Sequence, residues 1–210
     1  MKALIIANGI PPPRRFVRSL ARSADLIVAA DGGANLARKL HIKPDVILGD
    51  LDSILPSTKK FFKTVPLLFI EHQNSTDLEK AIEFCIRRGS RSIDIVGAIG
   101  DRIDHSSGSL GSFKKYGHRV DLKLFDSVAT ISMIQKEMHF RARPGEVLSL
   151  IPLDRCEGVT TKNLKYPLTN GRLELGVREG IHNEATSKPV SIRVKRGTLL
   201  LYRFYEPQCR

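Results

Sequence analysis

The sequence has few of the features that mark membrane-spanning, secreted or zinc-binding proteins. Its three cysteines, Cys85, Cys156 and Cys209, are odd in number and far apart, so they form neither a disulfide framework nor a C-x-x-C metal pair. No apolar stretch approaches the ~20 residues that a membrane-spanning helix needs. The N-terminal segment MKALIIANG has an apolar run of only five residues and no small-residue cleavage site. We therefore expect a first strand there, not a signal peptide, and a cytoplasmic protein.

The sequence also lacks long runs of one charge, although its composition is strongly basic. Lysine and arginine outnumber aspartate and glutamate by 34 to 22, which gives a net charge of +12. Such a charge suits nucleic acid, an anionic membrane surface or anionic small molecules. The densest basic group consists of four arginines whose spacing is typical of one solvent-exposed face of a helix. Its members are Arg14, Arg15, Arg18 and Arg22. Because no run of five or more like charges is present and no aromatic platform typical of RNA-binding domains accompanies the arginines, we expect neither nucleic acid nor membrane as a partner. A nucleic-acid-binding module remains the alternative from a different class.

Aspartates that follow the predicted strands stand out against this basic composition. They lie in the segments VAADGGAN, VILGDLDS, QNSTDLEKA and GAIGDRIDH, and they are Asp31, Asp50, Asp52, Asp77, Asp101 and Asp104. Parallel sheets bind their ligands at the carboxyl ends of the strands. Carboxylates gathered there would repel one another without a cation, and Mg²⁺ prefers such oxygen ligands, usually beside substrate phosphates. The series predicts an enzyme that handles a metal-bound phosphate substrate.

The pattern of apolar residues predicts two domains. Through residue 126, short apolar runs alternate with helical segments, which favours an α/β domain with a mainly parallel, Rossmann-like sheet. The clearest helix spans about 76–88, where Thr76 and Glu79 have the spacing of a capping box. Residues 127–210 contain only short strand candidates, with hairpin signals at 144–145 and 196–197. They predict a small antiparallel, β-sandwich-like domain.

Each aspartate motif also has an ordinary structural interpretation. In GDLDS, two carboxylates on an extended segment could share a cation, but the segment could also be a polar turn. At the start of the helix near Asp77, polar side chains cap the helix, while its free N–H groups suit phosphate. Arg102 can pair with phosphate oxygens, and Asp104 can orient or deprotonate a hydroxyl. The alternative for these two is an arginine–aspartate pair on the surface.

Taken in order, the motifs resemble those of the thiamine pyrophosphokinase (thiamine diphosphokinase) family, and the resemblance covers nearly the whole chain. The matching segments are ADGGAN at 30–35, PDVILGDLDSI at 44–54, STDLEKAI at 75–82 with Gln73 before it, GAIGDRIDH at 97–105, PGEVLSLIPL at 144–153, LKYPL at 164–168 and GIHNE at 180–184. The family transfers a diphosphate group from ATP to thiamine, with Mg²⁺, and gives thiamine diphosphate and AMP. The close alternative is a pyrophosphokinase for another alcohol, such as a pterin.

The resemblance also implies the roles of domains and residues. Residues 1–126 would form the catalytic domain that binds ATP and Mg²⁺, and 127–210 would contribute to thiamine binding and to a homodimer. The metal ligands would be Asp50, Asp52 and Asp77, and the catalytic residues Asp104, Arg102 and Asp77. The ATP-binding residues would be Asp31, Gly32, Gly33, Asn35, Thr76 and Arg102. The thiamine-binding residues would be Gln73, His182, Asn183 and Tyr166. His182 stands where the family usually has serine, and Tyr166 is a candidate for stacking because the chain has no tryptophan.

Overall fold

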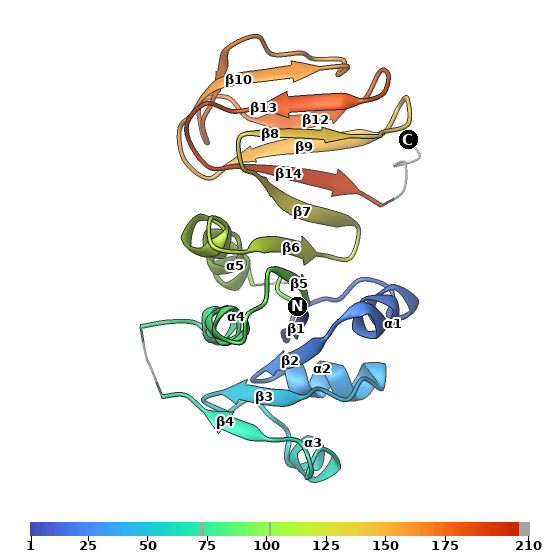
Figure 1. Ribbon diagram of the computed structural model, residues 1–210, viewed down its shortest axis with the longest axis vertical. Helices are drawn as coiled ribbons and strands as arrows, with labels where there is room; N and C mark the ends of the chain where they lie inside the picture. The colour runs from blue at the N-terminus through green and yellow to red at the C-terminus, as the bar shows by residue number, and fades with distance from the viewer. Residues whose placement is uncertain (72–73, 101, 206–210) are drawn as a thin grey trace. The chain divides into compact units, whose positions relative to one another are not determined.

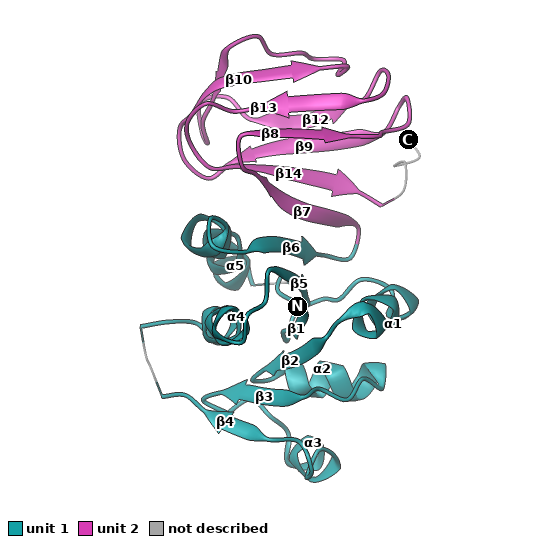
Figure 2. Ribbon diagram, in the orientation of Figure 1, with its two compact units in different colours: residues 1–127 teal, residues 128–210 magenta. Residues whose placement is uncertain are grey.

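The chain divides into two compact units, 1–127 and 128–210, drawn in teal and magenta in Figure 2. The computed structural model describes residues 1–71, 74–100 and 102–205. Unit 1 combines parallel strands with helices, and unit 2 is built of antiparallel strands (Figure 1). The predicted fold class is therefore confirmed. Within the described residues, no helix is long and apolar enough to cross a membrane.

Unit 1 is a parallel sheet with the strand order β6-β5-β1-β2-β3-β4. Its strands are β1 (Lys2–Ile6), β2 (Leu26–Ala30), β3 (Val46–Gly49), β4 (Leu67–Phe69), β5 (Ser92–Val96) and β6 (Asp121–Phe125). Its helices are α1 (Arg14–Ser23), α2 (Gly33–Leu40), α3 (Pro56–Phe61), α4 (Asp77–Arg87) and α5 (Ile103–Tyr116). The central strand β1 is an unbroken apolar run, and its residues 3–6 are fully buried. Such runs are expected where helices cover both faces of a parallel sheet.

The strand order of unit 1 contains one reversal. The chain moves outward from β1 through β2 and β3 to β4, and then returns to β5 on the other side of β1. Because crossover connections between parallel strands are right-handed, this return also changes the face that the helices cover. Helices α4 and α5 accordingly lie on one side of the sheet, and α1, α2 and α3 lie on the other (Figure 1). The carboxyl ends of β1 and β5 flank the reversal, which is the usual position of a ligand site in such sheets.

Unit 2 is a pair of antiparallel sheets that share one apolar core. One sheet has the order β12-β9-β14-β7 and the other β11-β10-β13-β8. The strands are β7 (Ala129–Ile134), β8 (Glu137–Phe140), β9 (Val147–Pro152), β10 (Cys156–Lys162), β11 (Gly171–Leu173), β12 (Gly180–Glu184), β13 (Val190–Arg193) and β14 (Leu199–Phe204). Buried side chains from both sheets, such as Leu148, Leu199 and Ile192, belong to one cluster.

The two predicted hairpins in unit 2 are wrong. At 144–145 the chain does reverse, but β8 before the turn pairs with β13, and β9 after it pairs with β12 and β14. At 196–197, β13 pairs with β8 and β10, whereas β14 pairs with β7 and β9. Both turns therefore lead from one sheet to the other. Turn residues indicate where a chain reverses, but the burial of the strands' apolar faces decides which sheet the next strand joins.

Candidate active site

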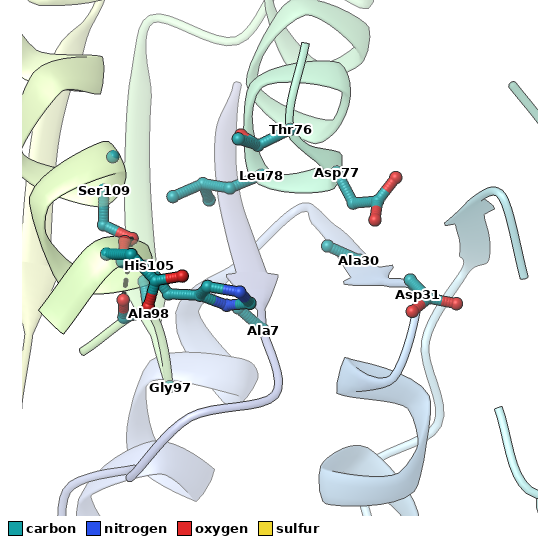
Figure 3. A pocket seen from close by; sticks show the side chains of 12 residues that line it. Ala7, Ala30, Asp31, Thr76, Asp77, Leu78, Gly97, Ala98, His105 and Ser109 are labelled. Carbon is teal, nitrogen blue, oxygen red and sulfur yellow. Dashed lines mark hydrogen bonds between the residues drawn. The ribbon is translucent and has the colours of Figure 1, made fainter. Parts of the chain in front are cut away.

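A cavity of about 370 Å³ lies in unit 1 at the carboxyl ends of β1, β2 and β5. The starts of α4 and α5 complete its wall. The lining residues are Ala7, Ala30, Asp31, Thr76, Asp77, Leu78, Gly97, Ala98, Asp104, His105, Gly108 and Ser109. Figure 3 shows Asp31 and Asp77 near one another on one side and the imidazole of His105 projecting from α5 on the other. The cavity thus occupies the point where the strand order reverses.

Three carboxylates converge beside this cavity, and two of them, Asp31 and Asp77, belong to its lining. Asp31, Asp50 and Asp77 each offer an oxygen atom, and these atoms all lie within 4.8 Å of one another. Asp31 directly follows β2, Asp50 follows β3 and Asp77 is the first residue of α4. Gly49 is the residue that lets them approach, because a Cβ atom there would lie 2.9 Å from the Asp31 Cβ and 3.0 Å from Asp77 Oδ1. We call Asp31, Asp50 and Asp77 the carboxylate cluster.

The environment of Asp31 decides whether the residues of the cluster suit a cation. Asp31 is only 7% exposed, and its Oδ1 atom has no hydrogen-bond partner within the described residues. Burial raises the pKa of the Asp31 carboxyl, and the nearby charges of Asp77 and Asp50 raise that pKa further, while hydrogen bonds from Gly32 and Ser53 oppose the change. An all-carboxylate set with one unpartnered oxygen atom matches the donor chemistry that Mg²⁺ prefers. The residues therefore fit a hard divalent cation.

Asp52 lies apart from this set. Among the described residues, Asp50 belongs to the carboxylate cluster and Asp52 does not. Asp52 is exposed and accepts a hydrogen bond from Ser53 Oγ at 2.8 Å. The intervening Leu51 has a φ of +62°, so the segment GDLDS is not the extended strand in which both carboxylates would face one side. Asp31, which the resemblance assigns to ATP, has the position beside Asp50 and Asp77 instead.

The start of α4 is fixed by the predicted capping box. Thr76 Oγ1 accepts a hydrogen bond from the backbone N–H of Glu79, and the Glu79 carboxylate accepts one from the N–H of Thr76. These bonds hold the first turn of the helix, and with it the adjoining Asp77. Lys80, one turn further on, donates to Asp77 Oδ1 at 2.9 Å. Sequence reasoning missed Lys80, although the i,i+3 spacing from Asp77 was a signal that the two side chains meet.

Arg102 and Asp104 form an exposed ion pair at the start of α5. Arg102 Nη2 donates to Asp104 Oδ2 at 2.6 Å, and the two side chains are 69% and 59% exposed. The hydrogen bond from Arg102 lowers the pKa of the Asp104 carboxyl, so Asp104 is ionised at neutral pH. Asp104 and its neighbour His105 both line the cavity, on the side formed by α5.

The segment DGGAN shapes the backbone beside the cluster. An added Cβ atom at Gly33 would collide with the backbone of β1, and one at Gly32 would collide with the side chain of Asn8. Asn35 makes two hydrogen bonds to the segment after β3, donating to the carbonyl of Ser53 at 2.9 Å and accepting from the N–H of Leu55 at 3.1 Å. The Asn35 amide therefore braces the loop that carries Asp50.

In unit 2, the residues that the resemblance assigns to thiamine lie around β12. Asn183 is buried, and its side chain accepts from the N–H of Tyr166 at 3.1 Å and donates to the Tyr166 carbonyl at 2.8 Å. Asn183 thereby fixes the backbone of Tyr166, a residue that is 62% exposed. Gln73 lies outside the described residues.

His182 is one of the residues that line a mainly apolar cavity of about 330 Å³ in unit 2. Its backbone has a φ of +57°, and its N–H donates to Ser149 Oγ at 3.1 Å. The centroid of its ring lies 6.3 Å from that of Phe204. The cavity is lined by Ser149, Leu150, Ile151, Pro152, Leu175, Glu179, Ile181, His182, Tyr202 and Phe204.

Two family models match the chain in sequence. Residues 17–125 match "Thiamin pyrophosphokinase, catalytic domain", and residues 132–199 match "Thiamin pyrophosphokinase, vitamin B1 binding domain".

The chain belongs to the thiamin pyrophosphokinase family.

Individual family members are similar over most of this chain. Thiamine pyrophosphokinase 1 of Arabidopsis thaliana is 30% identical, over 83% of this chain and 75% of that protein. Thiamine pyrophosphokinase of Bacillus subtilis (strain 168) is 27% identical, over 95% of this chain and 96% of that protein. A crystal structure of the thiamine pyrophosphokinase from Bacillus subtilis superposes with a TM-score of 0.83 at 24% identity, over 97% of this chain and 99% of that one. The solved structure of thiamin pyrophosphokinase from Candida albicans gives a TM-score of 0.84 at 17% identity, over 98% of this chain and 89% of that one. The two solved structures share the fold of this chain.

Proposed function

We propose that this member of the thiamin pyrophosphokinase family transfers the diphosphate group of ATP to the hydroxyl of thiamine, giving thiamine diphosphate and AMP. The observation that carries the proposal is the carboxylate cluster at the strand-order reversal of unit 1, in a chain that matches both models of the family. Membership of this family favours thiamine over another alcohol such as a pterin. It equally favours an enzyme over a nucleic-acid-binding module.

The cation would be Mg²⁺, held by Asp31, Asp50 and Asp77, with Asp52 close along the chain as a further proposed ligand. When bound, Mg²⁺ would neutralise charge on the phosphate oxygens of ATP. The protein's own contribution is to hold these carboxylates at one point before the substrate arrives. Gly49 supplies the room, and the capping box at Thr76 fixes the helix that carries Asp77.

Arg102 and Asp104 are suited to the phosphate chain and the attacking hydroxyl, respectively. The exposed Arg102 guanidinium can exchange its bond with Asp104 for charge-assisted bonds to phosphate oxygens. Asp104 would then be released to accept a hydrogen bond, and finally the proton, from the thiamine hydroxyl. The free N–H groups at the start of α4 beside Thr76, and the glycines at 32 and 33, would accommodate the nucleotide. Phosphoryl-type transfer depends chiefly on such positioning and charge stabilisation.

Unit 2 would contribute to the binding of thiamine. Its apolar cavity beside His182 offers aromatic and aliphatic surface, and Asn183 holds the exposed Tyr166 in place. Apolar and aromatic surface of this kind suits the rings of thiamine. Gln73, of unit 1, is proposed as a further thiamine contact from the resemblance alone. We also propose a homodimer, because unit 2 exposes large apolar side chains, among them Leu175 at 72% and Val177 at 67%.

The proposal is tested by the dependence of AMP release on the alcohol. Purified protein with ATP and Mg²⁺ should release AMP when thiamine is added, and should release none with a pterin alcohol. Asp50→Asn should lose this activity while its circular dichroism spectrum stays that of the wild type. AMP release with the pterin alcohol and not with thiamine would contradict the proposed substrate. Full activity of Asp50→Asn would contradict the proposed role of the cluster.

A further inference from the structure

The side chain of Lys80 is buried against the carboxylate cluster. Its Nζ atom lies 2.9 Å from Asp77 Oδ1, and the Lys80 side chain is only 7% exposed. A buried ammonium group costs free energy unless a paired charge compensates it. Most of the other lysines that pair with carboxylates in the described chain are about half exposed, such as Lys115 at 52% and Lys165 at 45%. The position of Lys80 therefore requires an explanation beyond an ordinary surface pair.

The charges of the site suggest that explanation. The carboxylate cluster of Asp31, Asp50 and Asp77 contributes three negative charges and Lys80 one positive charge, which leaves a formal charge of −2 for this group, in which Asp52 is not counted. One divalent cation matches that charge. We propose that Lys80 is a built-in counter-ion of the carboxylate cluster, whose charge weakens the cluster's hold on a cation and leaves it a net charge that one divalent ion balances. This inference rests on the metal site of the proposed function.

The unpartnered oxygen of Asp31 gives independent support. The pairing of Lys80 is with Asp77, whereas Asp31 Oδ1 stays buried without a partner in the described structure. Lys80 thus offsets the repulsion within the cluster and leaves a ligand atom open. By Coulomb's law, a fully neutralised site would attract a cation only weakly, and three uncompensated carboxylates would attract one more strongly than the cluster with Lys80 does.

Two roles for Lys80 predict opposite changes in cation affinity. If Lys80 only held the Asp77 side chain in place, its removal would weaken cation binding. If Lys80 acts through its charge, its removal would strengthen cation binding. Lys80→Gln separates the two roles further, because glutamine can still donate a hydrogen bond to Asp77 but has no charge.

The test measures the binding of Mn²⁺ to the nucleotide-free protein by electron paramagnetic resonance, and of Tb³⁺ by luminescence. We expect Lys80→Met and Lys80→Gln to bind Mn²⁺ roughly tenfold more tightly than the wild type, the order that Coulomb's law gives for one unit charge near a divalent ion at high effective dielectric. The gain for Tb³⁺ should be larger, because the electrostatic interaction scales with the charge of the cation. In metal-free buffer, both variants should also unfold at a lower temperature than the wild type and regain the difference when Mn²⁺ is added.

Lys2→Met is the matched control. Lys2 pairs with the buried Asp94 at 2.8 Å, at the first residue of β1 and therefore at the amino end of the strand, away from the cluster. This variant loses the same charge, so it should be destabilised without any change in cation affinity. If Lys80→Met and Lys80→Gln bind Mn²⁺ as tightly as the wild type or more weakly, the inference about Lys80 is overturned and the proposed metal site still stands. The absence of Mn²⁺ binding by the wild type would overturn the inference together with the proposed metal site.

Discussion

Gly49→Ala is the substitution that tests most severely whether the carboxylate cluster depends on close backbone packing. Gly49 ends β3 with a φ of +142°, a conformation that side-chain-bearing residues rarely adopt. The added Cβ atom would lie 2.9 Å from the Asp31 Cβ and 3.1 Å from the Asp77 Cγ. Asp31 is buried and cannot rotate its own Cβ away, so we expect the backbone after β2 or the Asp77 carboxylate to be displaced.

The expected cost has two parts. The unfavourable φ costs about 1–3 kcal/mol. Overpacking a buried site costs about 1–3 kcal/mol more. We therefore expect Gly49→Ala to lower the free energy of unfolding by at least about 2 kcal/mol, and to lose binding of Mn²⁺ because the cluster opens.

Gly89→Ala supplies the control for backbone strain alone. Gly89 follows the end of α4 with a φ of +84°, and an added Cβ atom would meet nothing within 4 Å. This variant should lose about 1 kcal/mol of stability and keep both Mn²⁺ binding and turnover. Urea unfolding gives the two free energies, and titration with Mn²⁺ gives the two affinities. If both variants lose the same stability and both bind Mn²⁺ as the wild type does, the packing at Gly49 does not shape the cluster.

Three further substitutions address the charge, the helix start and unit 2. Burial and neighbouring charges raise the pKa of Asp31 in the folded state, so the folded protein keeps this proton to a higher pH than the unfolded chain does. The free energy of unfolding of the metal-free protein should therefore fall as pH rises from about 4 through the raised pKa of Asp31. Asp31→Asn should remove this dependence of the unfolding free energy on pH, measured by urea unfolding in the presence of EDTA. An unchanged pH profile would show that Asp31 is not the cause. Thr76→Ala should lose about 1 kcal/mol in the same assay, since it breaks the capping box; a loss near zero would mean that other bonds hold the start of α4. His182→Ala should raise the KM for thiamine by roughly tenfold without changing kcat, as expected when only binding surface is lost; an unchanged KM would separate the apolar cavity of unit 2 from thiamine.

The convergence of aspartates on one edge of the sheet could be predicted from the sequence. Asp31 and Asp50 each follow an apolar run that reads as a parallel strand, and such strands end at a common edge regardless of side-chain detail. The capping box at Thr76 was equally visible, because it depends on residue types at a fixed local spacing. The common edge of the strands and the capping box both follow from local backbone geometry, which a short stretch of sequence is enough to specify.

The membership of the cluster could not be predicted in the same way. The choice between Asp31 and Asp52 depends on the left-handed conformation of Leu51, and leucine gives no sign of such a conformation. Nor does the pattern reveal that Asn35 and Asn183 use their amides to hold neighbouring backbone. A motif specifies which polar groups occur, whereas tertiary contacts decide which of them face the cavity. The same limit explains the wrong hairpins in unit 2, whose strands pair according to the packing of two sheets.

The fate of the terminal phosphate tests the central claim most directly. ATP labelled with ¹⁸O in its γ-phosphate should be incubated with the protein, Mg²⁺ and thiamine, and the products separated by mass. Attack of the thiamine hydroxyl on the β-phosphorus predicts unlabelled AMP and thiamine diphosphate that carries the label in its terminal phosphate. Unlabelled ADP with labelled thiamine monophosphate would place the attack at the γ-phosphorus and contradict the account.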